Sequence, residues 1–361
     1  MKQNNYLLNL LKVTIFSFLL IATAPVRAEI KVVTTIKPLH SLVANVMDGI
    51  GEPGLIIDGS ISPHSFTMKP SHAKMLEEAD VIFWIGEGIE TSMEGPLDSI
   101  AKGAEVIEFM ELDSITKLKF REESIFGDHD DHDDHDDHDD HDDHDDHDDH
   151  DDHDDHDDHD DHAGHDHGEF DPHAWLSTNN AKVWLNEIAA KLSTIDPDNA
   201  GTYFANANEA KAEIDNLNIE INQTLDPVRG GKFIVFHDAY QYFETTFEFS
   251  ASGAISLGDA SDPSAARIAE IAERIEKENI SCVLSEPQFN AGLVQTVMGN
   301  TKAATEVIDP LGFGIEPGPE LYNKLIRAYR IRYLNSEEII NNKSIYNTLI
   351  KHLFNFLLTK N

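Results

Sequence analysis

Strands and helices alternate along most of the chain, judged by where apolar residues recur. Short runs rich in Val, Ile and Thr predict strands, and the segments between them have apolar residues at helical spacing. Before residue 110 the predicted strands lie at 31–35, 54–57, 81–85 and 104–107. After Gly231 the predicted strands lie at 232–236, 281–284 and 305–308, with helices at 264–278, 291–300 and 320–332. This alternation predicts an α/β fold of two lobes, each a mainly parallel sheet covered by helices.

A stretch of different character separates the two predicted lobes. Between residues 181 and 225, Ala, Glu, Lys, Asn and Leu dominate at helical spacing, and Asp196-Pro197 indicates a break between two helices. The predicted organisation is an N-terminal lobe at 29–180, a helical linker at 181–225 and a C-terminal lobe at 226–336. A tail at 337–361 has no assigned role. Its apolar stripe between residues 345 and 357 favours packing on the second lobe over binding to a membrane surface, because its polar face is not strongly basic.

The first 28 residues have the layout of a secretory signal peptide. A basic start and an apolar run, Val13 to Ala24, precede a small-x-small cleavage site that ends at Ala28. The apolar run is much shorter than the roughly 20 residues that span a bilayer, which argues against a membrane anchor. No cysteine lies nearby to carry a lipid. We therefore expect the mature chain to begin near Glu29 and to work in the periplasm.

The formal net charge of −40 is distributed very unevenly. Residues 128–167 hold 24 of the 67 acidic residues and no Lys or Arg, so the rest of the chain is only moderately acidic. Nucleic acid is excluded as a partner, because phosphate binding requires basic patches. The only cysteine, Cys282, lies in a predicted strand and has no other cysteine to pair with. Packed cores, and not a disulfide, must therefore stabilise the fold.

The acidic segment 128–167 is a repeat of Asp-Asp-His. Such a stretch cannot build a packed core, whereas imidazole is a preferred ligand of zinc, copper and nickel. A triplet repeat expanded by replication slippage is the alternative, and the two explanations are compatible; the composition favours metal binding. The histidines of the segment are His129, His132, His135, His138, His141, His144, His147, His150, His153, His156, His159, His162, His165 and His167.

Three further histidines lie next to the ends of predicted elements. His64 follows the second strand, His173 comes directly after the repeat, and His237 ends a buried strand. Ligands of α/β proteins bind at the carboxyl ends of strands, and Asp309 also follows a strand. Three neutral imidazoles and one carboxylate would suit four-coordinate Zn²⁺. Spacing alone leaves the structural alternative open, because isolated loop histidines are usually surface residues and Asp309 before a proline is typical of a turn.

Several motifs carry a resemblance to a known family. They are PHSF at 63–66, DPHAWLS at 171–177, FHDAYQYF at 236–243, SEPQF at 285–289 and DPLG at 309–312. With them the sequence resembles, from about residue 30 to 330, the periplasmic zinc-binding component of bacterial metal ABC importers, the ZnuA type. The resemblance implies two Rossmann-like lobes joined by one long rigid helix, with metal in the interlobe cleft. It also implies His64, His173 and His237 as the metal ligands, and an acidic His-rich loop is a further family feature.

The sequence departs from the family pattern at three places. Some zinc-binding members have an acidic residue where Pro63 stands, which leaves Asp309 or a water as the fourth ligand. Some members pair a cysteine at the position of Cys282 with a second one near the C-terminus, and that partner is missing. The tail beyond about Ser336 has no counterpart in the family.

The sequence therefore predicts a monomeric periplasmic protein, not an enzyme, that captures Zn²⁺ and delivers it to an inner-membrane ABC permease and its ATPase. The Asp-Asp-His segment would collect ions loosely and pass them to the cleft. A manganese-specific protein is one alternative, although related manganese binders tend to have Glu where His237 stands and a nitrogen-rich shell suits zinc. A periplasmic zinc buffer without an importer is another. A zinc hydrolase ranks last, because the H-E-x-x-H pattern does not occur.

Overall fold

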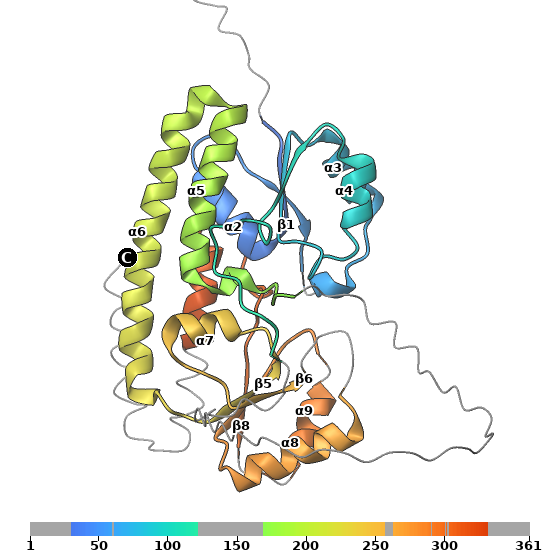
Figure 1. The fold of residues 1–361 in the computed structure, drawn as a ribbon, viewed down its shortest axis with the longest axis vertical. Coiled ribbons are helices and arrows are strands. Elements are labelled where there is room, and N and C mark those ends of the chain that lie inside the picture. Colours follow the sequence, from blue (N-terminus) through green and yellow to red (C-terminus); the bar gives the residue numbers. More distant parts are fainter. Residues whose placement is uncertain are drawn as a thin grey trace, which may run out of the picture.

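The fold is that of a computed structural model. The signal peptide predicted at 1–28, the segment predicted to collect metal at 128–167 and the tail at 337–361 all lie outside the residues that it describes. Figure 1 shows two α/β lobes stacked along one side of a long helix pair. The described residues are 30–59, 61–121, 169–256, 263–289, 291–299, 301 and 303–330.

The N-terminal lobe is built on a four-stranded parallel sheet. The strands are β1 (Val32–Ile36), β2 (Gly54–Ile57), β3 (Val81–Trp84) and β4 (Glu105–Glu108), in the order β2-β1-β3-β4. All residues of β1 and β3 are buried, as expected for central strands made of β-branched and aromatic residues. Figure 1 shows α2 (Lys37–Val46) on one side of the sheet and α3 (Pro70–Glu78) and α4 (Glu94–Ile100) on the other.

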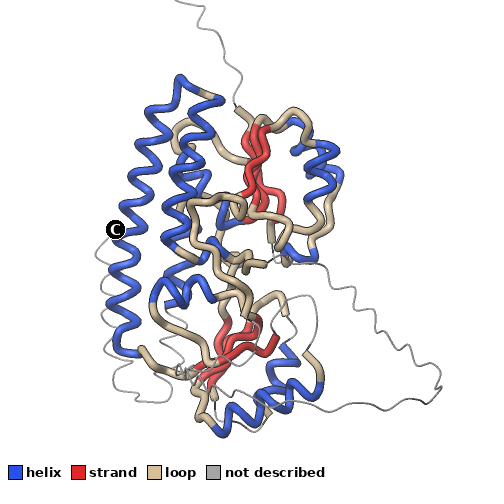
Figure 2. Tube along the Cα trace, in the orientation of Figure 1, coloured by secondary structure: helices blue, strands red, loops and turns tan. Residues whose placement is uncertain are grey.

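The C-terminal lobe repeats this arrangement. Its strands are β5 (Phe233–His237), β6 (Gly253–Ser256), β7 (Cys282–Ser285) and β8 (Ala304–Val307), all parallel in the order β6-β5-β7-β8. The helices of this lobe are α7 (Gln241–Phe247), α8 (Ala265–Lys277) and α9 (Ala291–Met298). Figure 2 shows the two sheets as separate red layers. The predicted fold class, two α/β lobes with parallel sheets, is confirmed.

Two helices lie beside both lobes. α5 (Thr178–Ile195) and α6 (Ala200–Leu225) pack against each other, and Asp196-Pro197 separates them. α5 begins where the side-chain oxygen of Ser177 accepts a hydrogen bond from the backbone N–H of Asn180. α6 spans about 39 Å at 1.5 Å per residue, and it contacts α2 of the first lobe and α7 of the second (Figure 1). One long helix thus connects the lobes.

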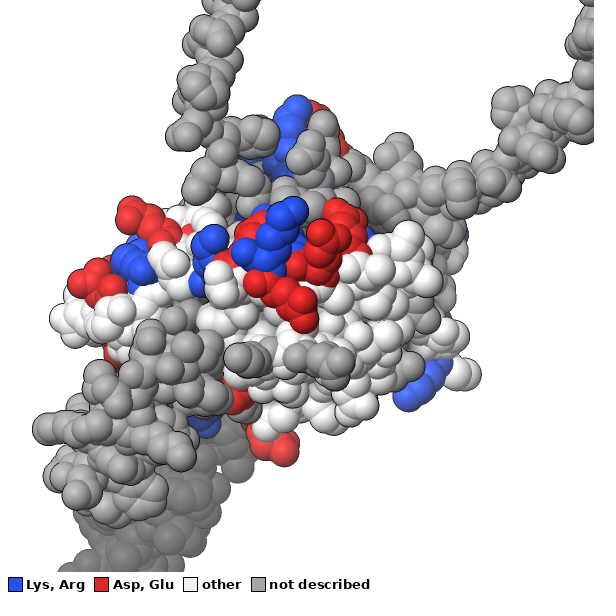
Figure 3. Space-filling view, turned by 90° about the horizontal axis from the view of Figure 1, so that it is seen from below, with Lys and Arg blue, Asp and Glu red and all other residues white. Residues whose placement is uncertain are grey.

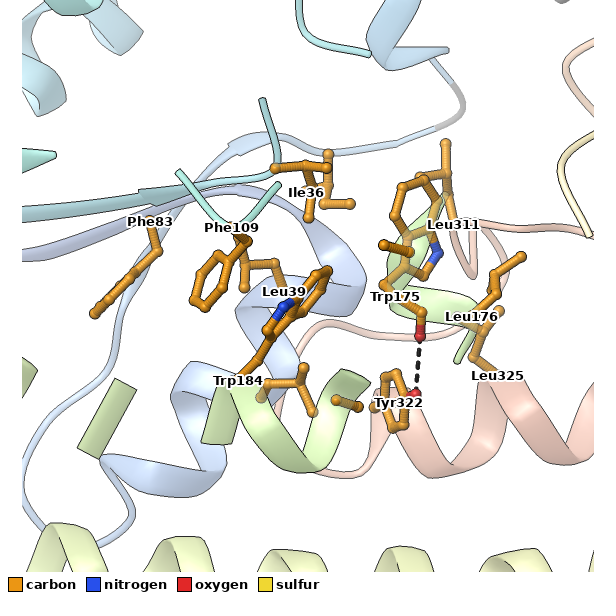
Figure 4. Close-up of a cluster of buried hydrophobic side chains, with 14 of the residues drawn as sticks. Ile36, Leu39, Phe83, Phe109, Trp175, Leu176, Trp184, Leu311, Tyr322 and Leu325 are labelled. Carbon is orange, nitrogen blue, oxygen red and sulfur yellow. Dashed lines mark hydrogen bonds between the residues drawn. The ribbon is translucent and has the colours of Figure 1, made fainter. Parts of the chain in front are cut away.

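The returning C-terminal segment packs between the two lobes. Residues 321–330 are helical, and in Figure 4 their side chains Tyr322 and Leu325 meet Trp175 and Leu311 in one buried cluster. The hydroxyl of Tyr322 donates to the backbone oxygen of Trp175 over 2.8 Å. The ammonium group of Lys37, at the start of α2, donates to backbone oxygens of the loop 312–315 of the second lobe. The lobes therefore share one packed core close to their cleft.

The surface charges seen in Figure 3 are mixed in sign. On the face viewed from below, acidic and basic side chains lie side by side. At this end of the molecule, Arg267 of α8 pairs with Glu270, and Arg274 pairs with Glu278, which directly follows the helix. Among the residues that the structure describes, no helix is long and apolar enough to span a membrane.

Candidate metal centre

A small pocket lies where loops from both lobes meet. Its cavity volume is about 10 Å³, which is room for roughly one water-sized particle. The space therefore fits an ion and is too small for an organic substrate. The residues around it are Ser62, Pro63, His64, Ile89, His173, Trp175, His237, Glu286, Gln288, Phe289, Pro310 and Leu311.

His64 comes from the loop that follows β2. Pro63 begins a single 3₁₀ turn, Pro63–Ser65, because its fixed φ suits the first position of a helix. Phe66, the next residue, is buried and anchors the turn in the core of the first lobe. The ring centroid of His64 lies 5.7 Å from that of His173. The sequence-predicted His64 thus lines the pocket from the N-terminal lobe.

His173 lies just before the short turn Ala174–Leu176, which leads into α5. Its side chain is buried, and its Nδ1 atom lies 2.7 Å from Oδ1 of Asp171. The same Oδ1 also accepts the backbone N–H of His173 over 2.9 Å. Burial raises the pKa of Asp171 to about 7, and the hydrogen bond from His173 and the positive charge of Arg121 partly offset this rise. Asp171 therefore fixes the ring of His173.

His237 is the last residue of β5, and Glu286 directly follows the neighbouring strand β7. Because the carboxyl ends of parallel neighbours meet at one sheet edge, the two side chains are brought together. Nδ1 of His237 lies 2.8 Å from Oε1 of Glu286, and both groups are buried. Burial raises the pKa of Glu286, and the nearby His237 opposes the rise. Glu286 holds His237 as Asp171 holds His173.

The two buried histidines point their other ring nitrogens at each other. Nε2 of His173 and Nε2 of His237 are 3.4 Å apart. Zinc–nitrogen bonds of 2.0–2.1 Å at a tetrahedral centre place two ligand nitrogens roughly 3.3–3.4 Å apart. When each Nδ1 donates its proton to a carboxylate, both Nε2 atoms present lone pairs to the pocket. Two facing acceptors at this distance form a site for a cation.

The candidate ligand side chains are not close enough together to form a complete coordination sphere. In the ranges that the structure describes, no group of three or more His, Cys, Asp or Glu side chains is gathered as a metal site. The wider separation is on the side of His64, whose ring is 5.7 Å from His173, compared with 5.1 Å between the rings of His173 and His237. The pocket thus holds a preformed pair of imidazoles and a third one nearby.

Asp309, predicted as a fourth metal ligand, has hydrogen-bond partners within its own loop. Its Oδ1 accepts the backbone N–H of Leu311 over 2.9 Å, and its Oδ2 accepts the backbone N–H of Phe313. Asp309 is not among the residues that line the pocket. A short acceptor before a turn satisfies the local backbone donors first. Asp309 therefore shapes the loop that carries Pro310 and Leu311 to the pocket wall.

A buried charge cluster lies behind the histidines. Arg121 is the last described residue before the segment 122–168, and its guanidinium pairs with Asp238 over 2.9 Å and with Glu244 over 2.6 Å. Burial raises the pKa of Asp238 to about 6 and that of Glu244 to about 7, and Arg121 opposes both rises. Sequence reasoning missed this cluster and the carboxylates Asp171 and Glu286. The signal that could have found Asp171 and Asp238 is their proximity in sequence to the candidate histidines.

The fold and the pocket together define a two-lobed α/β protein with a small histidine-lined pocket between its lobes. Residues 32–330 match the family described as "Zinc-uptake complex component A periplasmic", and the chain belongs to this family. Relatives named "High-affinity zinc uptake system protein ZnuA" are similar to this chain over most of its length. The protein of Brucella abortus (strain 2308) is 48% identical over 296 residues, covering 82% of this chain and 88% of the relative.

Further comparisons agree with this assignment. The relative of the same name from Paracoccus denitrificans (strain Pd 1222) is 43% identical over 309 residues, which is 85% of this chain and 92% of that protein. A solved structure described as "Crystal structure of ZnuA" superposes with a TM-score of 0.64 at 22% identity. The superposition covers 84% of this chain and 99% of that one. At this identity the structural likeness concerns the fold alone.

Proposed function

We propose that this chain captures Zn²⁺ in the periplasm and delivers it to an inner-membrane ABC permease and its ATPase. The observation that carries the proposal is the pair of Nε2 atoms of His173 and His237, 3.4 Å apart, with each Nδ1 held by a buried carboxylate. Membership in the zinc-uptake family supports the transport role. The names of the relatives, high-affinity zinc uptake proteins, support zinc as the cargo.

Zinc would bind to the Nε2 atoms of His64, His173 and His237. The ion loses its water when it enters the narrow pocket, and this cost must be offset by ligand bonds and nearby negative charge. Asp171 and Glu286, behind two of the imidazoles, carry up to two negative charges that match the charge of Zn²⁺. A shell of three imidazoles favours zinc over manganese, which prefers oxygen ligands. His64 would move slightly inward as the third bond forms.

The segment 128–167, including the fourteen histidines from His129 to His167, would collect zinc for the pocket. It lies outside the described residues, which end at Arg121 before it and resume at Glu169 after it. Lys119 and Phe170 form an antiparallel bridge, and the backbone N–H of Asp171 donates to the oxygen of Leu118 over 2.8 Å. Phe170, one of the two residues of this bridge, lies three residues before His173 in the chain. Transfer from a tethered collector to the pocket would be effectively intramolecular.

We propose that the protein is exported and works as two lobes joined by a helical linker. Residues 1–28 would direct export and be removed, and the mature protein would act as a monomer. The boundaries 29–180, 181–225 and 226–336 would mark the two lobes and their helical linker. Because α6 and the contacts of Lys37 connect the lobes, closure on zinc binding would be small. The protein would bind and release its cargo without catalysing a reaction.

Growth and uptake in zinc-poor medium test this proposal. A strain that lacks the gene should recover growth and zinc uptake when it receives the unaltered gene. It should not recover with the His173→Ala variant, and it should recover with Gln223→Ala, a change of an exposed residue of α6 outside the pocket lining. Full recovery with His173→Ala would contradict the assigned site. Normal zinc uptake in the strain without the gene would instead indicate a periplasmic zinc buffer.

A further inference from the structure

The proposed zinc ligands His64, His173 and His237 leave the fourth coordination position of the ion without a ligand. Protein-bound zinc usually has four ligands, and the three histidines supply only three. Both carboxylate oxygens of Asp309 already accept backbone N–H groups of the 311–313 turn. Oε1 of Glu286 is bound to Nδ1 of His237, which places this carboxylate, Oε2 included, on the side of the ring away from Nε2. Neither carboxylate is therefore placed to bind an ion held by the Nε2 atoms.

Gln288 supplies an oxygen that has no such engagement. It lines the pocket, and its Oε1 atom is buried and accepts no hydrogen bond within the part of the chain that the structure describes. A buried acceptor without a partner is costly, and native structures retain few of them. An acceptor of this kind beside three imidazoles has the properties of a metal ligand, because carbonyl oxygen can bind divalent cations.

The backbone around Gln288 is held firmly next to His237. Glu286 is fixed by its hydrogen bond to His237. The ring of Phe289 lies 4.5 Å from the ring of Phe236 and 5.5 Å from that of His237, measured between centroids. Gln288 stands between these two anchored residues. Gln288 follows β7 and His237 ends the neighbouring strand β5, so both residues lie at the same edge of the C-terminal sheet.

We propose that the side-chain carbonyl oxygen of Gln288 is the fourth zinc ligand of this chain. The inference rests on the proposed zinc-binding function. Three neutral imidazoles and a neutral amide leave the two positive charges of the ion intact, and Asp171 and Glu286 are placed to balance them. A carboxylate as the fourth ligand would add a third negative charge to a buried site. A neutral oxygen also binds zinc more weakly than a carboxylate, which suits a protein that must release its cargo.

Zinc affinity and the visible spectrum of the cobalt-substituted protein test this assignment. Affinity is measured by competition with a chromophoric chelator in the full mature chain. Gln288→Ala should weaken zinc binding at least tenfold and change the Co²⁺ absorption bands, which report the ligand set. Gln295→Ala, a matched change of an exposed glutamine in α9, should change neither. Gln288→Glu keeps an oxygen ligand, so it should retain tight binding and shift the preference towards Mn²⁺.

Two results would overturn the assignment of Gln288. The first is an unchanged zinc affinity and Co²⁺ spectrum in a folded Gln288→Ala protein. The second is a loss of affinity with an altered spectrum in Asp309→Asn while Gln288→Ala behaves like the unaltered protein. Failure of the wider proposal looks different, because then His173→Ala would also retain tight zinc binding. If Gln288→Ala does not fold, Gln288→Glu decides the question: an unchanged preference for zinc over Mn²⁺ would count against the assignment.

Discussion

Replacing Asp171 by Asn should weaken zinc binding without weakening the fold. Oδ1 of Asp171 is 2.7 Å from Nδ1 of His173 and also accepts the backbone N–H of that residue. An asparagine has the same shape and keeps one oxygen acceptor, but it removes the negative charge behind the imidazole. The substitution therefore isolates the electrostatic contribution of a group that does not touch the ion.

The expected magnitude follows from the kind of contact that is lost. Changing an outer-shell partner of a ligating histidine typically lowers metal affinity by about 10–100-fold. This range corresponds to roughly 1.4–2.8 kcal/mol of binding free energy. The stability of the zinc-free protein should not fall in the same way. Burial raises the pKa of Asp171 to about 7, so its ionisation costs more free energy in the folded state than in the unfolded state. Its removal should leave the free energy of unfolding unchanged or slightly higher.

Both quantities are measured on one preparation. Zinc affinity comes from chelator competition at pH 7.5, and stability comes from urea unfolding in the presence of a strong chelator. Asp215→Asn serves as the matched control, because Asp215 is an exposed partner of Lys182 and does not line the pocket. A folded Asp171→Asn protein with unaltered zinc affinity would refute the reasoning. A large loss of stability without zinc would show that Asp171 is mainly a structural residue.

Three further outcomes are expected. The zinc-free protein should lose thermal stability as the pH rises from about 4.5 to 7. Burial raises the pKa of groups such as Glu90 and Glu244 to about 7, so the folded state there holds protons that the unfolded state has released. A melting temperature that rises over this window would contradict the burial of these groups. Trp184→Ala should cost about 3–5 kcal/mol in urea unfolding, because the ring is fully buried; a loss below about 1 kcal/mol is incompatible with that core. Ser177→Ala should cost about 1 kcal/mol in the same assay through the lost N-cap of α5, and an unchanged midpoint would argue against the cap.

Much of the fold was predictable because most strands have a strong local signal. Segments such as VVTTI of β1 and FIVFH of β5 combine β-branched or aromatic residues with complete burial. The observed strands start or end within about a residue or two of the predicted ones, as expected from pattern alone. The short elements α7 and β6 were not predicted. β6 has only four residues and begins with Gly253, so its pattern is too short to show a period.

The site was predictable only where the chain itself places a residue at a strand end or beside the repeat. His237 reaches the pocket from the carboxyl end of β5, and His64 and His173 reach it from short turns. The contact of His237 with Glu286 depends on the register between β5 and β7, which sequence alone does not reveal. Asp309 was predicted from its place after a strand, and sequence alone did not reveal that its carboxylate accepts the backbone N–H groups two and four residues later.

Anomalous X-ray diffraction at the zinc absorption edge, from crystals of the mature protein grown with one equivalent of zinc, tests the central claim most directly. We predict an anomalous peak between the Nε2 atoms of His64, His173 and His237, about 2.0–2.1 Å from each. The Asp171 and Glu286 carboxylates should lie behind their imidazoles, outside bonding distance of the ion. Ordered zinc bound elsewhere, with no peak in this pocket, would contradict the account.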